Sequence, residues 1–423
     1  MPHGTQDLFL QDPSGDLTDN VKAKAVITYL SGRLVSAYFL DGHCIRINAP
    51  DPDLPTGCIY VGRIERVVPQ LGCCFIEFQK GVRGYYSLSE NRHTFWPDHP
   101  SSEDHIPKGG DRIVVQVRRP AIAPKEALLS SELSLTGYYL VLTSGDHSVH
   151  FSKKLRKSEQ DPDVKSALEA VSAACSKTAG ISCGFIVRTN AAGAPSDSIL
   201  AEAECLRHRM EAILARAVSA PACTKIGEGQ KEWERDTEQL PKECDPELIT
   251  DVPEICRFFQ ESFLAGKVKL TVYEDTTYPL SSLYRLETLR DRALARIVRM
   301  KSGANLYIDR TEALTAIDVN AAASSSSGPA VPEKKKLAVN LEAAEEVARQ
   351  LRLRNISGMI LVDFISMREE DNKACLLKVL RKAVQSDPVP VQVLDMTRLG
   401  LVEITRKKEG RDIYEAFSRK PLL

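Results

Sequence analysis

The chain has 423 residues, of which 43% are hydrophobic and 27% charged, and its formal net charge is −1. This length predicts two to four domains, and the composition is that of a soluble globular protein. The balanced charge excludes a nucleic-acid-binding surface spread over the whole molecule and leaves room only for a local patch.

The sequence carries no signal for a membrane or for export. No stretch approaches the roughly 18 consecutive apolar residues of a membrane helix, and the N-terminus lacks the basic-then-apolar pattern of a signal peptide. We therefore expect a cytoplasmic protein without a membrane partner. The 11 cysteines form no Cys-x-x-Cys pair, so neither a zinc nor a redox motif is present. Several lie in apolar runs and are interpreted as small buried hydrophobic residues rather than disulfide partners: Cys73, Cys74 and Cys183.

The first third of the chain has the pattern of β-structure. Residues 24–47 alternate short apolar strands with Gly and Asp-Gly turns, which predicts an antiparallel meander. From Gly57 to about Ser131 the strands are short and evenly spaced, with one long loop at 91–106. This spacing predicts a small barrel of the oligonucleotide-binding (OB) type.

The middle of the chain mixes helices and strands. A helix is predicted near 160–178, and a charged amphipathic helix over 198–217. Residues 225–247 are polar and rich in Glu and Lys, which is typical of a surface loop or linker. Apolar residues recur at helical spacing over 283–300 and predict one helix there.

Two aspartates end two apolar, strand-like runs. Asp318 and Asn320 should point the same way, because strand side chains alternate with period two. Asp363 follows residues 359–362, a run apolar enough to be buried on both faces. A lone buried carboxylate costs on the order of several kcal/mol unless it is paired, hydrogen-bonded or bound to a metal. Two Asp with an Asn nearby suit Mg²⁺, whereas a strand-end Asp that caps the next turn is the alternative for either one alone.

A helix is predicted between these two strands, beginning near Asn340 as its N-cap. Acidic residues near its start and Arg349, Arg352 and Arg354 near its end complement the helix dipole. Strand, helix and strand predict a parallel pair with a right-handed crossover. Both aspartates then lie at the same edge of the sheet, where open α/β folds carry their sites.

The segment 321–336 leaves Asn320 directly and is of low complexity. One interpretation is a tolerated linker. The other is an active-site loop whose basic end, Lys334–Lys336, attracts phosphate.

Three ordered segments, 311–320, 340–354 and 358–365, resemble the catalytic core of the ribonuclease E/G family. Weaker similarity extends over about residues 24 to 408. The resemblance implies a multi-subdomain fold of the α+β and α/β classes. Its parts would be an RNase H-like subdomain (1–56 and 215–280) split by an S1 (OB-fold) RNA-binding barrel (57–131) and a 5′-sensor region (132–214), then a DNase I-like catalytic subdomain (281–408) and a C-terminal tail (409–423).

The resemblance also implies an activity. The family cleaves single-stranded RNA endonucleolytically by Mg²⁺-dependent hydrolysis, leaving 5′-phosphate and 3′-hydroxyl ends, in RNA processing or decay. The expected partners are thus rRNA precursors or mRNA. Asp318 and Asp363 match the family's metal-binding aspartates, drawn with one metal, and Asn320 matches the asparagine that orients the first of them. Arg188 and Thr189 match the pair that binds the 5′-monophosphate of the substrate, although an Arg-Thr at a strand end also occurs as a solvated surface pair.

Four residues of the barrel match RNA-binding positions of the family. Phe75, Phe78 and Tyr85 match aromatic residues that stack on bases, and Lys125 matches a lysine near the RNA backbone. Alternate aromatics on a barrel strand are more often core residues. Phe75 and Phe78 also differ in parity, so both face RNA only if the strand carries a bulge.

The sequence departs from the family pattern in four places. The basic segment that follows the Asp-Val-Asn is replaced by 321–327, rich in Ala and Ser; Ser366 stands at an acidic position and Pro390 at a basic one. The Cys-Pro-x-Cys zinc link is absent, so a zinc-linked tetramer is not expected, while a homodimer through other surfaces is left open. The metal-dependent endoribonuclease is the favoured hypothesis. The alternatives are a catalytically weak or inactive RNA-binding protein and a structural protein with a relict fold.

Overall fold

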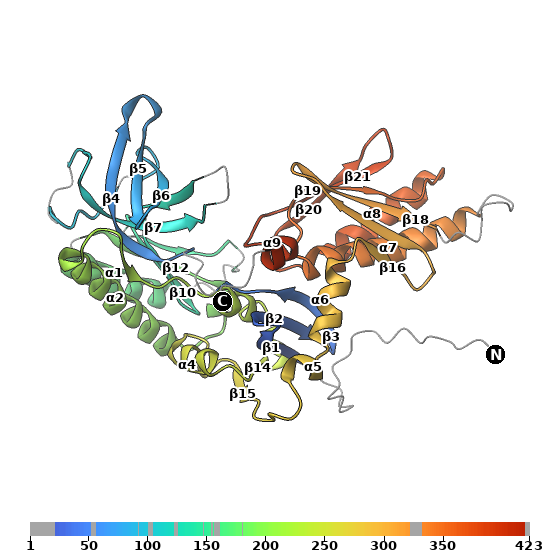
Figure 1. Cartoon of the computed structure of the whole chain (residues 1–423), viewed down its shortest axis with the longest axis horizontal. Helices are drawn as coiled ribbons and strands as arrows, with labels where there is room; N and C mark the ends of the chain where they lie inside the picture. Colours follow the sequence, from blue (N-terminus) through green and yellow to red (C-terminus); the bar gives the residue numbers. More distant parts are fainter. Residues whose placement is uncertain are drawn as a thin grey trace. The chain divides into compact units, whose positions relative to one another are not determined.

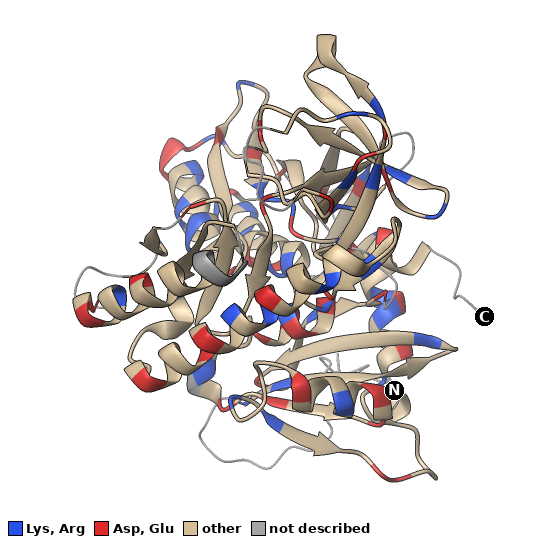
Figure 2. Cartoon of the chain, turned by 90° about the vertical axis from the view of Figure 1, so that its left-hand side faces the viewer, with Lys and Arg blue, Asp and Glu red and all other residues tan. Residues whose placement is uncertain are grey.

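The computed structural model describes residues 22–51, 56–91, 93–99, 105–121, 126–146, 148–153, 155, 161–179, 181–321 and 332–418. The chain divides into two compact units: unit 1 comprises Met1–Asp51 and Glu232–Leu423, and unit 2 comprises Pro52–Lys231. Figure 1 shows the elements of both units. Basic and acidic residues are interspersed in Figure 2, in keeping with the net charge of −1.

The predicted antiparallel meander forms one side of a sheet in unit 1. Its two turns, Ser31-Gly32 and Asp41-Gly42, have positive φ at both central residues (51°, 74°, 49° and 72°), as the tight hairpin turn that matches strand twist requires. The five-stranded sheet has the order β15 (Lys269–Val272), β14 (Glu247–Thr250), β1 (Ala23–Leu30), β2 (Arg33–Leu40) and β3 (His43–Asn48). Nearby elements are α3 (Glu232–Thr237), η4 (Lys242–Cys244), α4 (Pro253–Glu261), α5 (Leu280–Leu283) and α6 (Leu286–Leu294).

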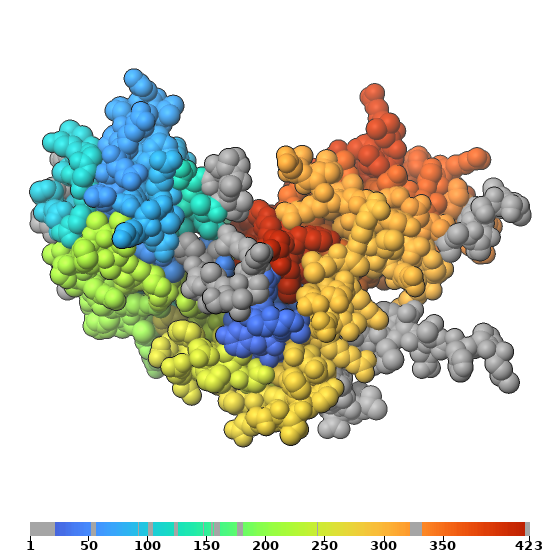
Figure 3. Space-filling view, in the orientation of Figure 1, coloured from blue at the N-terminus to red at the C-terminus, as the bar shows by residue number. Residues whose placement is uncertain are grey.

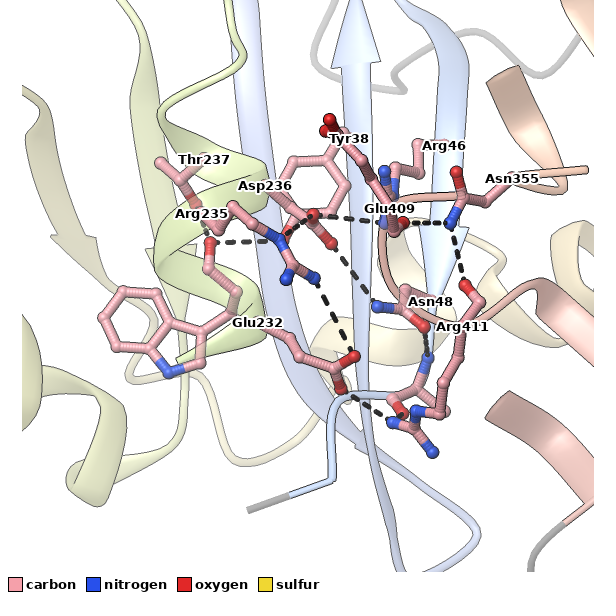
Figure 4. Close-up of polar contacts among 12 residues, drawn as sticks. Tyr38, Arg46, Asn48, Glu232, Arg235, Asp236, Thr237, Asn355, Glu409 and Arg411 are labelled. Atoms are coloured by element: carbon pink, nitrogen blue, oxygen red, sulfur yellow. Dashed lines mark hydrogen bonds and ion pairs between the residues drawn. The ribbon is translucent and has the colours of Figure 1, made fainter. Parts of the chain in front are cut away.

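The prediction of a surface loop over 225–247 is wrong, because the segment includes α3, η4 and the start of β14. Figure 4 shows the polar contacts of its buried residues Glu232 and Asp236. Asp236 of α3 lies 3.1 Å from Arg46, and Glu232 lies 2.7 Å from Arg411, with all four side chains at most 10% exposed. Partners distant in sequence neutralise these charges. A polar stretch of sequence is therefore not necessarily exposed to solvent.

The prediction of a single helix over 283–300 is also wrong in part. Leu286 and Leu289 are buried as expected, but Arg285 takes a left-handed conformation (φ 48°) that separates α5 from α6. Helix α6 ends at Leu294, and strand β16 (Ile297–Arg299) begins soon after it, paired with β17 (Asn305–Arg310). A strand partner thus overrides the helical spacing of the sequence.

The second sheet of unit 1 contains both aspartates. Helices α7 (Glu333–Leu353) and α8 (Glu370–Val384) supply core residues that pack with Ile317, Val319, Ile360 and Val362 (Figure 1). The prediction that residues 359–362 are buried on both faces is wrong, because Met359 is 56% exposed. The six-stranded order is β16 (Ile297–Arg299), β17 (Asn305–Arg310), β18 (Leu314–Asn320), β19 (Gly358–Asp363), β21 (Leu401–Arg406) and β20 (Val391–Met396).

The C-terminal segment, predicted as a tail over 409–423, is packed into unit 1 as far as residue 418, where the description ends. Asn355 donates hydrogen bonds of 2.9 and 2.8 Å to the carbonyls of Glu409 and Arg411. Ile413, the first residue of α9 (Ile413–Ser418), is 1% exposed. Figure 3 shows the segment, in red, among its neighbours in unit 1.

Unit 2 contains a closed five-stranded barrel, which confirms the OB-like prediction. Its strands follow one another by hydrogen bonding from β4 to β5, β6, β8 and β7, and β7 pairs back onto β4. Strand β13 adds to the outer edge of β4. The elements are β4 (Ile59–Val68), η1 (Pro69–Leu71), β5 (Cys73–Gln79), β6 (Val82–Ser87), β7 (Arg112–Arg119), β8 (Ala127–Ser130) and β13 (Thr224–Gly227).

The rest of unit 2 is a four-stranded sheet with two helices. Both helices agree with the sequence prediction, and Cys183 is buried as expected. The strand order is β11 (Val149–Phe151), β12 (Cys183–Val187), β10 (Leu140–Ser144) and β9 (Ser134–Thr136), with α1 (Pro162–Ala179), η3 (Thr189–Ala191) and α2 (Ser196–Ser219).

Candidate active site

The two predicted metal-binding aspartates stand side by side. Asp318 in β18 is paired in register with Asp363 in β19, and the two strands are parallel. Neighbouring strands lie about 4.8 Å apart, and paired side chains project from the same face. Both aspartates are exposed, whereas Ile317 and Val362 next to them are buried. The carboxylates therefore share the open face of the sheet.

Asn320 fixes the orientation of Asp318. Its Nδ2 donates a hydrogen bond of 2.6 Å to Oδ2 of Asp318, and Oδ1 has no such partner among the described residues. Two carboxylates with space for water and phosphate suit Mg²⁺, whose ligand bonds are about 2.1 Å long. The described residues contain no group of three or more His, Cys, Asp or Glu that could hold a metal. With no third such ligand among the described residues, an ion held by Asp318 and Asp363 would complete its coordination with water or substrate.

The helix between the two strands begins earlier than predicted, and Asn340 is not its N-cap. Helix α7 starts at Glu333, because good helix formers extend it toward the N-terminus. Asn340 is 0% exposed inside the helix. Its Nδ2 donates to the carbonyl of Ile365 (2.8 Å), and its Oδ1 accepts from the Ile365 N–H (3.0 Å). The amide thus holds the backbone two residues beyond Asp363.

Asn340→Ala is expected to lower the free energy of unfolding by about 3 kcal/mol, because both backbone groups of Ile365 lose a buried partner. The loop after Asp363 should loosen as well. Urea denaturation measures the loss. Asn372→Ala is the matched control, because its amide donates to the exposed side chain of Glu369 and has no other hydrogen bond among the described residues. Equal stability of the two variants would contradict the role assigned to Asn340.

One of the three lysines at the start of α7 makes a structural contact. Lys336 donates a hydrogen bond of 3.0 Å to the carbonyl of Ser366, in the same loop. Lys334 and Lys335 are exposed, so phosphate attraction by this end stays a prediction. Residues 322–331 of the low-complexity segment lie outside the described residues.

Arg188 and Thr189 lie in unit 2, where β12 passes into η3. The Arg188 guanidinium donates to the carbonyl of Gly137. Glu202 accepts from the N–H groups of Tyr139, on the same loop, and of Leu140, the first residue of β10 (2.8 and 2.9 Å), and burial raises the pKa of Glu202. A Cβ at Gly137 would collide with Oε1 of Glu202, so only glycine allows this approach. The loop is therefore fixed beside Arg188, and Thr189 is exposed.

The barrel separates the three predicted aromatic residues. Phe75 and Tyr85 are cross-strand partners on the outer surface, with ring centroids 6.3 Å apart. Tyr85 is 36% exposed, whereas Phe78 is 1% exposed and packs on Tyr60 in the barrel core. Phe78 is thus not available to stack on a base. The difference in parity predicted that Phe75 and Phe78 would not both face RNA without a bulge, and the structure shows that Phe78 is the buried one. Lys125 lies outside the described residues.

Two arginines that the sequence did not single out flank the aromatic pair. Arg66 is the cross-strand partner of Phe75. On the other side, Arg119 lies two strands from Tyr85, because Leu128 is the cross-strand partner of both residues. Arg66 and Arg119 are exposed, and neither forms an ion pair with another described residue. A surface aromatic pair between cations, here exposed Tyr85 and half-buried Phe75, is typical of a surface for single-stranded nucleic acid. Only the strand register reveals this arrangement.

The fold is that of a mixed α/β protein with a closed OB-like barrel, and the site adds a carboxylate pair on an open sheet face. The family model described as "Ribonuclease E/G family" matches residues 134–409. The chain belongs to this family, as its motifs predicted.

Relatives of known name cover most of the chain. It is 31% identical over 382 residues to Ribonuclease E of Haemophilus influenzae, covering 88% of this chain and 40% of the relative. It is 30% identical to Ribonuclease E of Escherichia coli (88% and 35%) and 29% identical to Ribonuclease G of Haemophilus influenzae (83% and 72%). The chain thus spans well under half the length of these two Ribonuclease E proteins.

None of the helices in the described ranges combines the length and apolarity needed to cross a membrane. The cytoplasmic location stays a prediction.

Proposed function

We propose that this chain is a metal-dependent endoribonuclease that cleaves single-stranded RNA. The observation that carries the proposal is the in-register pair Asp318 and Asp363, with Asn320 bonded to Asp318, on an open sheet face. Family membership and relatives named ribonucleases support the same reaction. The products would carry 5′-phosphate and 3′-hydroxyl ends, and Mg²⁺ would be the cofactor.

The residues of the site would divide the work. Asp318 and Asp363 would hold the ion, and Asn320 would keep the Asp318 carboxylate turned toward it. When bound, the ion would polarise the scissile phosphate and lower the pKa of the attacking water. Asn340 would fix the loop after Asp363. Positioning and charge stabilisation do most of the work in phosphoryl chemistry, so a rigid site matters more than a strong nucleophile.

The barrel would supply the RNA-binding surface. Bases would stack on Phe75 and Tyr85 with little regard to sequence. Arg66 and Arg119 would track the phosphates on either side. The physiological substrates would be rRNA precursors or mRNA. A homodimer stays a prediction.

Arg188→Ala is expected to remove the preference for a 5′-monophosphate. A guanidinium has five N–H donors, so Arg188 can hold the Gly137 carbonyl and a terminal phosphate together. Loss of a charge-assisted hydrogen bond should lower kcat/KM about tenfold or more on 5′-phosphorylated RNA. The rate on 5′-hydroxyl RNA should stay the same. A variant that slows on both substrates equally would contradict a 5′-sensing role.

The proposal is tested by incubating the chain with a 5′-phosphorylated, single-stranded oligonucleotide, with Mg²⁺ or with EDTA. Internal cleavage that needs Mg²⁺ is expected. The alternative is an RNA-binding protein of the same fold with weak or no catalysis, favoured by the missing basic residues after Asn320. It predicts salt-dependent RNA binding without Mg²⁺-dependent products.

A further inference from the structure

An aromatic side chain lies directly beside the carboxylate pair. Tyr307 of β17 is the cross-strand partner of Asp318, so its side chain projects from the same open face. Its neighbours Leu306 and Ile308 are buried on the other side, and Tyr307 itself is partly exposed. Across the sheet at this level, the order of residues is Ile297, Tyr307, Asp318 and Asp363.

The ring of Tyr307 is held by a cation. The Arg296 guanidinium lies 5.6 Å from the ring centroid. Asp309 fixes that guanidinium with two hydrogen bonds of 2.6 and 2.7 Å. Asp309 and Asn305 lie on opposite sides of Tyr307 along β17, so Arg296 covers the side of the ring toward Asp309. Among the described residues no other guanidinium or aromatic ring contacts Tyr307, so the side toward Asn305 is the face that a ligand could meet. A pre-positioned ring loses little conformational entropy when a ligand stacks on it.

A second cation lies on that open side. Arg299 of β16 is paired with Asn305, which is paired with Asn320. Arg299 is exposed and forms no ion pair with a described residue. It lies two strands from Asn320, about 10 Å between backbones, within reach of a phosphate next to the carboxylates. The basic residues missing after Asn320 thus have a candidate replacement on a neighbouring strand.

We propose that Tyr307 and Arg299 form a nucleotide subsite beside the carboxylate pair, in which Tyr307 stacks on one RNA base next to the cleaved bond. Arg299 binds an adjacent phosphate. The inference rests on the proposed endoribonuclease function. The subsite is selective for unpaired bases, because a base in a duplex has no free face to offer the ring.

The test uses 5′-phosphorylated, single-stranded RNA in which one nucleotide at a time near the cleaved bond is abasic. For the wild-type chain, one abasic position should lower kcat/KM about tenfold, the effect of losing one base stacked on an aromatic ring. Tyr307→Ala should lower kcat/KM on intact RNA by a similar factor and be insensitive to the same abasic position. Tyr307→Phe keeps an aromatic ring and should therefore show the wild-type kcat/KM on intact RNA and the wild-type sensitivity to the abasic position. Tyr29→Ala removes an equally strand-borne tyrosine, 53% exposed, and should behave as wild type.

A second readout does not need cleavage. RNA with 2-aminopurine at the sensitive position, or at each position in turn, is bound to the Asp318→Asn, Asp363→Asn chain, where stacking on Tyr307 should quench its fluorescence. Quenching lost with Tyr307→Ala supports the subsite even if the wild-type chain cleaves nothing, which would refute only the proposed function. The subsite is overturned if 2-aminopurine stays quenched in the Tyr307→Ala chain at every position. It is also overturned if the Tyr307→Ala chain keeps its sensitivity to the abasic position. If Tyr307→Ala changes the oligomeric state of the chain but not its RNA binding or cleavage, the subsite is overturned as well. That result would assign the Tyr307 face to contact with a second copy of the chain.

Discussion

Replacing Asp318 and Asp363 with asparagine is expected to lower Mg²⁺-dependent cleavage by ~10³-fold or more, since a catalytic ion contributes several kcal/mol to the transition state and each 1.36 kcal/mol is tenfold in rate. The fold should survive. Both side chains are exposed, and asparagine keeps their shape. Removing two like charges on neighbouring strands should leave the melting temperature in EDTA unchanged or higher.

The control for this double variant is Asp371→Asn, which removes an exposed carboxylate from the first turn of α8. It should cleave at the wild-type rate. Cleavage by the double variant at the wild-type rate would show that the carboxylate pair is not the catalytic site. Loss of activity together with a fall in melting temperature would indicate damage to the fold instead.

The largest expected loss of stability comes from Asp387→Ala. Its carboxylate binds Nε and Nη2 of Arg406 at 2.9 and 3.1 Å, and the two side chains are 3% and 1% exposed. Arg406 also donates to Asn355, which holds the C-terminal segment. Removing one partner of a buried pair leaves the other charge uncompensated, so the free energy of unfolding should fall by ~3–5 kcal/mol.

Glu370→Ala is the matched comparison. Glu370 lies 2.7 Å from Lys373, closer than the Asp387–Arg406 pair, but its side chain is 84% exposed. Solvent screening should limit its effect to below ~1 kcal/mol. Urea denaturation at constant m-value measures both variants. Similar losses would mean that burial does not decide the strength of these ion pairs.

Local signals predicted much of the fold. The Ser31-Gly32 and Asp41-Gly42 turns specify their hairpins within a few residues, so the meander was readable from the sequence. The segment 225–247 was not, because Asp236 and Glu232 find their partners in Arg46 and Arg411, far away along the chain. Long-range pairing of that kind leaves no local pattern.

The candidate site shows the same division. The strand–helix–strand order predicted that Asp318 and Asp363 would meet, and their register bears this out. The cap preference of Asn predicts an N-cap at Asn340, whereas the place of Asn340 in an apolar stripe of α7 agrees with its burial. Tyr307 was missed because its position beside Asp318 depends on the pairing of β17 with β18. No spacing rule in one sequence supplies that register.

Direct titration with Mn²⁺, followed by its electron paramagnetic resonance, tests the central claim that Asp318 and Asp363 together hold a divalent ion. The wild-type chain should bind one ion that Mg²⁺ displaces. The Asp318→Asn, Asp363→Asn chain should lose that site, while Asp371→Asn keeps it. Equal uptake of Mn²⁺ by the wild-type and double-variant chains would contradict the account.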